Sequence, residues 1–331
     1  MQGPGRGDAS PAQARKCGAA ATRVDRRAAQ DVLSVPAMIA TEQGVPVGTP
    51  ADSKRDAMPS RFVCLLYHDV YAGDASQYGR IGRSATRYHV SECRFRQHLD
   101  LVERSGVRPL GAGALSACLD APAGAAGLPG VVFSFDDGWE GAVTRAAAAL
   151  VERRIPLLMF VTTDYIGRRF FARPEQLREL EPTLVTVGSH GVSHHLLSGV
   201  SSDTVRRELR DSRHRLEDVL GRSVTWLSAP GGAVDRRLVE VAREVGYTMV
   251  FTSAIGINPT AAGRWGVARL GVTAATSSAT LSRWLSLRLY PERLRNGVLA
   301  LPKRVLGMRL YAKLRRVVLG EAVGYDHLFE P

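Results

Sequence analysis

Two adjacent carboxylates, Asp136 and Asp137, follow an apolar run at residues 130–135. A short apolar run of this type is typical of a buried strand. Two like charges at the end of a buried strand carry a large desolvation cost unless a cation shares the site. The alternative interpretation is structural, because Asp137-Gly138 is also a common turn pair.

Two histidines, His190 and His194, stand four residues apart just after the apolar segment 184–187. If the residues between them form one helical turn, both imidazoles lie on the same side of it. Two imidazoles and one carboxylate are a common ligand set for a catalytic divalent metal that keeps an open position for water. Histidines are more often ordinary surface or core residues. His195 breaks the spacing, and we interpret it as a neighbour of the pair.

A Pro-Gly-Gly turn at residues 230–232 follows the apolar segment 224–227. Such a turn lets bare backbone come close to whatever lies at the ends of the strands. Taken alone, it fits an ordinary loop between a strand and a helix equally well.

Strands and helices alternate from residue 61 to residue 272. Apolar runs predict strands at 61–67, 130–135, 156–161, 184–187, 224–227, 247–252 and 267–272. Helical spacing of apolar residues predicts helices near 95–106, 140–153, 203–220 and 235–246. This alternation indicates an α/β fold with a mainly parallel sheet and helices outside it.

The residues with chemical potential come directly after strands. His68 follows the first strand, Asp136 the second, His190 the fourth and Ser228 the fifth. Barrel enzymes carry their chemistry at this carboxyl end of the strands. We therefore predict a distorted (β/α) barrel of about seven parallel strands.

Composition divides the 331 residues into three parts. Residues 1–58 are rich in Ala, Gly, Pro, Arg and Asp, which predicts a disordered or weakly ordered extension. Residues 59–280 contain the predicted barrel. Residues 281–331 alternate apolar and basic side chains and predict a basic helical tail.

The formal net charge is +12, and the ten basic and four acidic residues at 281–331 account for +6 of it. This placement favours peripheral contact of the tail with a membrane surface, and the alternative is a helix packed on the barrel. No helix-turn-helix, zinc-finger or aromatic-basic sheet signature accompanies the charge, so we expect no specific nucleic-acid partner. No secretory signal or membrane-spanning run is evident, and the expected location is cytoplasmic or peripheral to the membrane.

Together the three motifs are far more specific than each one alone. Phe133-Ser-Phe-Asp-Asp-Gly138, Gly188-Ser-His-Gly-Val-Ser-His194 and Ser228-Ala-Pro-Gly-Gly232 resemble, in this order, the polysaccharide deacetylase family (carbohydrate esterase family 4). Leu65-Leu-Tyr-His-Asp-Val70 also resembles the start of many such domains. The resemblance covers roughly residues 60–275. It implies a distorted barrel and metal-dependent removal of acetyl groups from N-acetylated amino sugars of an oligosaccharide, polysaccharide or glycoconjugate.

The resemblance also implies roles for particular residues. Asp136 matches the family's general base, and Asp137 matches its metal-binding aspartate. His190 and His194 match the two histidine ligands. Gly231 matches the position whose backbone N–H helps to hold the oxyanion. Zinc is the expected divalent metal because two imidazoles and a carboxylate suit it, with nickel, cobalt and iron as alternatives.

The chain departs from the family pattern around the base and the proton donor. Ser228 stands where many members have an arginine that orients the base, and the aspartate beside a tryptophan that pairs with this arginine is missing. Arg269, at the end of the last predicted strand, is our candidate substitute. The late Leu-His proton donor is also missing, since His327 lies far into the tail. In members resembling exopolysaccharide deacetylases an early Tyr-His supplies this role, and His68 fits it.

The mechanism implied is attack of metal-bound water on the acetamide carbonyl. The metal lowers the pKa of the water toward about 7, and Asp136 accepts a proton as it attacks. The metal and the Gly231 N–H stabilise the oxyanion, and His68 protonates the departing amine. Two rival hypotheses keep the same barrel: a non-catalytic carbohydrate-binding relative, and a hydrolase of another non-peptide C–N bond such as a ring amide.

Overall fold

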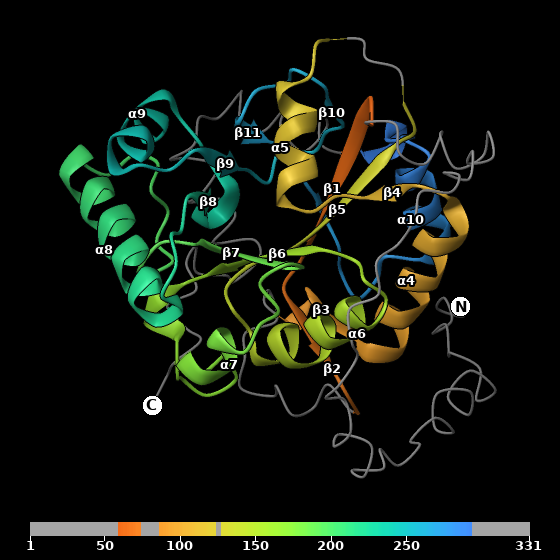
Figure 1. Ribbon diagram of the computed structural model, residues 1–331, viewed down its shortest axis with the longest axis horizontal. Helices are drawn as coiled ribbons and strands as arrows, with labels where there is room; N and C mark the ends of the chain where they lie inside the picture. The colour runs from red at the N-terminus through yellow and green to blue at the C-terminus, as the bar shows by residue number, and fades with distance from the viewer. Residues whose placement is uncertain (1–58, 74–85, 124–126, 293–331) are drawn as a thin grey trace, which may run out of the picture. The chain divides into compact units, whose positions relative to one another are not determined.

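The computed structural model describes residues 59–73, 86–123 and 127–292 (Figure 1). The predicted extension at 1–58 lies outside these ranges, and so do residues 293–331 of the predicted tail. No helix within the described ranges has the length and apolar content that crossing a membrane requires.

A parallel-dominated sheet that is nearly closed into a barrel forms the centre of the described residues. Its strands follow the order β10-β1-β5-β6-β7-β8-β9-β11, with β4 beside β5 and β12 beside β1. Every pair is parallel except β1 with β10. The bounds are β1 Arg61–Tyr67, β4 Arg108–Pro109, β5 Gly130–Phe135, β6 Leu157–Val161, β7 Val185–Ser189, β8 Trp226–Ser228, β9 Met249–Phe251, β10 Asn258–Pro259, β11 Trp265–Val267 and β12 Leu270–Gly271. The predicted α/β barrel is confirmed.

The chain itself joins the two edges of this sheet between β11 and β12. β11 pairs with β9 at one edge, whereas β12 pairs with β1 near the other. The side-chain amide of Asn258 holds this connection, because it donates to the carbonyl of Ala268 and accepts from its N–H, both at 2.9 Å. Arg269 follows directly, so the closure of the barrel fixes the position of Arg269.

The central strands β5, β6, β8 and β9 are buried throughout, and β1 is buried after Arg61, as a sheet with covered faces requires. Along β1, Val63, Leu65 and Tyr67 pack in one apolar cluster with residues of α4 (Glu92–Ser105), such as Leu99. The alternate residues Phe62 and Cys64 pack in a second cluster that includes Leu115 and Leu119 of α5 (Ala112–Asp120). This alternation follows from the two-residue period of a strand.

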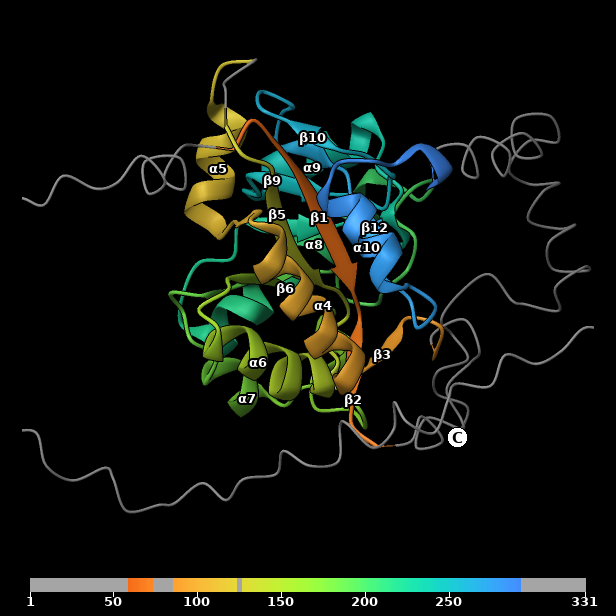
Figure 2. The ribbon, with the colours of Figure 1, turned by 90° about the vertical axis from the view of Figure 1, so that its right-hand side faces the viewer.

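Helices cover the outside of the sheet. The longer ones are α4 Glu92–Ser105, α5 Ala112–Asp120, α6 Ala147–Glu152, α8 Ser202–Leu220, α9 Arg236–Val245 and α10 Ser278–Leu285, and the short turns are η2 Ala142–Ala146, η3 Thr163–Tyr165, α7 Pro174–Arg178 and η4 Pro230–Gly232. The helices α4 and α10 lie side by side (Figures 1 and 2). A separate two-stranded sheet pairs β2 Asp69–Tyr71 with β3 His89–Ser91.

Capping groups mark the helix ends that the sequence predicts. The hydroxyl of Ser91 accepts from the N–H of Arg94 at the start of α4, and Gly106 ends it with φ 69°. The carboxylate of Asp235 likewise accepts from the N–H of Leu238 at the start of α9. α10 crosses the predicted boundary between barrel and tail, and its Leu281, Trp284 and Leu285 are buried.

Candidate active site

The two carboxylates lie at a backbone turn that directly follows β5. The N–H of Asp136 donates to the carbonyl of Tyr67 at 3.0 Å, which continues the pairing of β5 with β1. Asp137 then adopts a left-handed conformation with φ 75°, and Gly138 follows with φ 84°. Adjacent residues of an extended strand would face opposite sides of the sheet. The turn instead places both carboxylates, each buried, at the carboxyl end of the barrel.

Asp137, His190 and His194 come together as the sequence predicts. One potential ligand atom from each lies within 4.8 Å of the others. The Oδ1 atom of Asp137 is 3.4 Å from Nε2 of His190 and 3.2 Å from Nε2 of His194. All three side chains are buried, so water contributes little to screening their charges.

The geometry of His190 fits a metal ligand. Its Nδ1–H donates to the carbonyl of Ser228 at 2.7 Å, which leaves a lone pair on Nε2. Burial lowers the pKa of His190 to about 4, so the ring is neutral at physiological pH. A neutral Nε2 and the Oδ1 atom of Asp137 thus present lone pairs to each other, and a cation between them relieves the repulsion. The residues present therefore fit a divalent metal.

His194 reaches the same place from an irregular loop. The helical turn considered for the two histidines is not formed, since His194 has φ 63° and the residues between them contain no helix. The carboxylate of Glu208 on α8 determines the loop's path by accepting hydrogen bonds from the N–H groups of Val192 and Ser193 and from the Ser193 hydroxyl. Burial acts to lower the pKa of His194, but the carboxylate of Asp137 outweighs it and the pKa is raised.

The second oxygen of Asp137 is held by a residue that sequence reasoning missed. The indole Nε1–H of Trp139 donates to Oδ2 of Asp137 at 3.0 Å. Burial acts to raise the pKa of Asp137, but His194 and its other neighbours lower it well below its usual range. The only advance signal for this contact was the position of Trp139, two residues after the aspartate. A donor on one oxygen leaves the other directed at the histidines.

Asp136 makes a buried ion pair with Arg269, the candidate substitute for the missing arginine. The guanidinium donates to both carboxylate oxygens at 2.8 Å, and Arg269 is only 1% exposed. The hydroxyl of Ser228 donates to Oδ2 of Asp136 at 3.0 Å and accepts from Arg269 at 2.7 Å. Burial acts to raise the pKa of Asp136, but Arg269 and then His190 outweigh it, and the pKa is lowered. Asp136 is therefore ionised at physiological pH.

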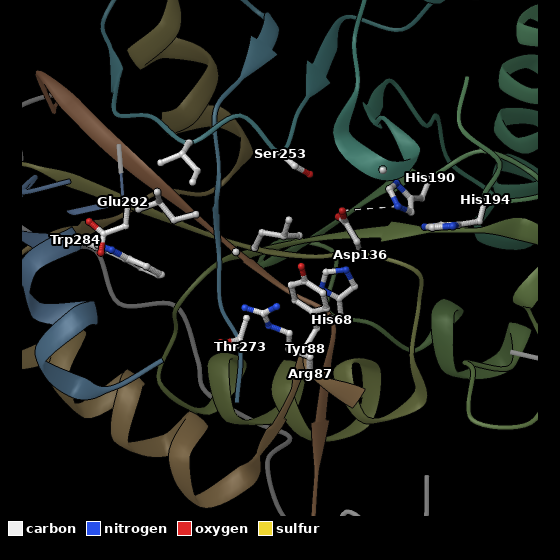
Figure 3. A pocket seen from close by; sticks show the side chains of 15 residues that line it. His68, Arg87, Tyr88, Asp136, His190, His194, Ser253, Thr273, Trp284 and Glu292 are labelled. Carbon is white, nitrogen blue, oxygen red and sulfur yellow. Dashed lines mark ion pairs between the residues drawn. The ribbon is translucent and has the colours of Figure 1, made fainter. Parts of the chain in front are cut away.

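A cavity of about 480 Å³ opens onto this end of the barrel (Figure 3). Asp136, His190 and His194 line it, together with His68 and Gly231. Nδ1 of His68 is buried and makes no hydrogen bond with the residues that the structure describes, and burial lowers the pKa of His68. Gly231 has φ 66°, and a Cβ there would collide with the side chain of Leu196. The structure thus collects all six predicted site residues around one cavity end, with Asp137 directed at the two cavity-lining histidines.

Comparisons with known proteins find similarity to polysaccharide deacetylases. Residues 124–250 match the model of the polysaccharide deacetylase family. YxkH of Bacillus subtilis is 21% identical over 227 residues, which are 69% of this chain and 77% of YxkH. The structure of IcaB from Ammonifex degensii superposes with a TM-score of 0.58 at 26% identity, over 69% of this chain and 98% of IcaB. The Streptococcus pyogenes deacetylase PplD, solved with acetate, also gives a TM-score of 0.58 at 20% identity, over 67% of this chain and 97% of PplD.

The match over residues 124–250 and the likeness to IcaB support a polysaccharide deacetylase domain. The protein is accordingly a hydrolase that acts on carbon–nitrogen bonds other than peptide bonds. Metal use is general in this family, and the cluster of Asp137, His190 and His194 is the candidate metal site of this chain.

Proposed function

We propose that the protein removes acetyl groups from N-acetylated amino sugars of an oligosaccharide, polysaccharide or glycoconjugate, and that it uses a divalent metal, with zinc the best fit. The observation that carries the proposal is a buried Asp-His-His cluster beside a second, ionised carboxylate in a single cavity. Zinc suits a set of two imidazoles and one carboxylate. The related deacetylase PplD was solved with acetate, the second product of such a reaction.

Asp137, His190 and His194 would hold the metal. When bound there, a divalent cation acidifies water and polarises a carbonyl oxygen. Asp136 accepts the proton of the attacking water, and its pairing with Arg269 keeps it ionised for this task. The N–H of Gly231 donates to the oxyanion, and His68 gives a proton to the departing amine. Water supplies the hydroxyl that completes acetate, and the sugar keeps a free amine.

Acetate release from N-acetylglucosamine oligomers, with and without a chelator, tests this proposal. Asp136→Asn is expected to bind metal normally and to lose activity by about 10²- to 10⁴-fold, the usual contribution of a general base. His190→Ala is expected to lose metal, which metal analysis of the purified protein measures. His214→Ala, an exposed histidine on α8, is the matched control and retains both properties.

Three outcomes contradict the proposal. An Asp136→Asn protein as active as the parent removes Asp136 from the mechanism. Saccharide binding by the metal-loaded parent without acetate release favours the non-catalytic carbohydrate-binding relative. Release of an amine from a ring amide, with none from N-acetylated sugars, favours the hydrolase of another C–N bond.

For the basic tail we propose contact with an anionic membrane surface. The support is the net charge of +6 in residues 281–331 and the alternation of apolar and basic residues there. The start of this segment instead packs on the barrel, because Leu281, Trp284 and Leu285 of α10 are buried. The proposal therefore concerns residues 293–331.

A further inference from the structure

The charged groups that line the catalytic cavity do not balance. The two acidic residues among them, Asp136 and Glu292, are each paired with an arginine. Asp136 binds Arg269, and Glu292 lies 3.1 Å from the guanidinium of Arg283. Arg87 also lines the cavity, and among the described residues it makes no ion pair with an acidic side chain. Among the arginine and carboxylate side chains of the described residues that line or pair at the cavity, Arg87 thus lacks an ionic partner, and solvent can reach it.

The backbone holds Arg87 at a defined place on the cavity wall. Its carbonyl accepts from the N–H of Ala274 at 2.9 Å, in the segment that follows β12. The next residue, Tyr88, packs its ring against that of His68 with centroids 4.7 Å apart. In Figure 3, Arg87 appears with Tyr88 and His68, between the catalytic end of the cavity and the end that Glu292 lines. Arg87 and Asp136 thus line one cavity, so a saccharide that occupies it can contact both.

We propose that Arg87 is a specificity-determining residue that binds an anionic group, a carboxylate or a phosphate, carried by the acetylated saccharide. The inference rests on the proposed function and adds the charge of the substrate to it. A guanidinium suits this role because its parallel N–H groups match the oxygens of carboxylate and phosphate. Charge attraction in a cavity also raises the local concentration of an oppositely charged substrate.

Two matched pairs of substrates test the proposal. N-acetylglucosamine is compared with N-acetylglucosamine 6-phosphate. N,N′-diacetylchitobiose is compared with the disaccharide of N-acetylglucosamine and N-acetylmuramic acid, which carries a carboxylate. Acetate release gives kcat and KM for the parent protein, for Arg87→Gln and for Arg87→Lys. Arg145→Gln, which removes the same charge from an exposed site outside the cavity lining, is the control.

Arg87→Gln is expected to raise KM for at least one anionic substrate by about tenfold and to change KM for its neutral counterpart by less than about twofold. Arg87→Lys restores part of the loss, and added salt weakens the preference of the parent for the anionic substrate. The substrate pair whose anionic member loses affinity in Arg87→Gln shows whether Arg87 binds a phosphate or a carboxylate. An equal effect of Arg87→Gln on both members of each pair, or no effect on either, overturns the proposal.

Equilibrium binding of the same four saccharides, measured by calorimetry, separates this inference from the proposed function. If the parent releases no acetate from any of them, the proposed function fails. In that case, tighter binding of an anionic saccharide that Arg87→Gln abolishes still supports the role of Arg87. Binding that is indifferent to the substitution contradicts it.

Discussion

Ser228 connects the base and a metal ligand through different atoms. Its carbonyl accepts the Nδ1–H of His190, and its hydroxyl donates to Asp136. The backbone contact does not depend on the side chain at this position, so the tautomer of His190 is independent of residue type. The serine side chain is small, so it leaves room for the guanidinium of Arg269 to bind the same carboxylate. A serine here is therefore consistent with an arginine supplied from the connection between β11 and β12.

Replacing Arg269 tests how the base is kept ionised. In Arg269→Gln the burial of Asp136 is no longer opposed by a positive charge, so its pKa rises. A protonated carboxylate cannot accept a proton, and the acidic limb of the kcat/KM profile is expected to move to higher pH. Ser228→Ala removes a hydrogen bond but no charge, and it is expected to move the limb less.

Stability provides a second measurement for the same pair of variants. Leaving one partner of a buried ion pair uncompensated costs about 3–5 kcal/mol of unfolding free energy, and losing one hydrogen bond costs roughly 1 kcal/mol. Arg269→Gln is thus expected to unfold at lower denaturant concentration than Ser228→Ala. An acidic limb that stays in place in both variants would show that Arg269 does not control the base.

The sequence identifies the site residues that follow strands and offers Arg269 as the partner of the base, but it misses two supporting contacts. Asp136 and His190 stand directly after apolar runs, where barrel chemistry is expected. The contact of Trp139 with Asp137 depends on a left-handed turn, and the contact of Ser228 with His190 depends on how β7 pairs with β8. Neither is encoded in local spacing.

At the scale of elements, burial decides which predictions succeed. The strands β5 and β6 are fully buried, and their apolar runs predict them to within one residue. The short β2 and β3 and the helix α5 were not predicted, because strands of three residues and a helix without a side-chain cap give little local signal. The predicted helix over 140–153 is divided, since a π-helical turn, η2, precedes α6.

The packing of α4 on β1 makes stability depend on pH. His98 of α4 is buried, its Nδ1 lies 3.0 Å from the hydroxyl of Tyr67, and burial lowers its pKa to about 4. Between pH 6.5 and about 4 the unfolded chain therefore binds a proton that the folded chain does not. The stabilisation that comes from keeping His98 neutral is complete above pH 6.5. As the pH falls toward about 4, the free energy of unfolding decreases by up to roughly 3 kcal/mol.

Denaturant unfolding at several pH values between about 4.5 and about 7.5 measures this effect. His98→Asn keeps an acceptor for Tyr67 but does not titrate, so its unfolding free energy is expected to fall less steeply with acid. His214→Asn removes an exposed histidine and is expected to leave the parent slope unchanged. Equal slopes for His98→Asn and the parent would contradict the assignment.

At the scale of the molecule, half of the excess positive charge belongs to the last 51 residues. The full chain is expected to sediment with anionic liposomes, and a chain lacking residues 293–331 is expected to remain in solution. The association of the full chain should weaken at high salt, because the attraction is electrostatic. Neutral liposomes are the control, and equal sedimentation of both chains with anionic liposomes would end the proposal of membrane contact.

The closure of the barrel has a practical consequence for anyone who subclones this protein. The family match ends at residue 250, before β11, β12 and the arginine between them. A gene fragment trimmed to the match would encode the acidic pair and both histidines, yet it would omit the guanidinium of Arg269 and the segment that joins the sheet edges. Trimming at residue 124 would also delete the first strand and His68. An inactive fragment of that kind would reflect the missing edge residues and would not count against the catalytic motifs.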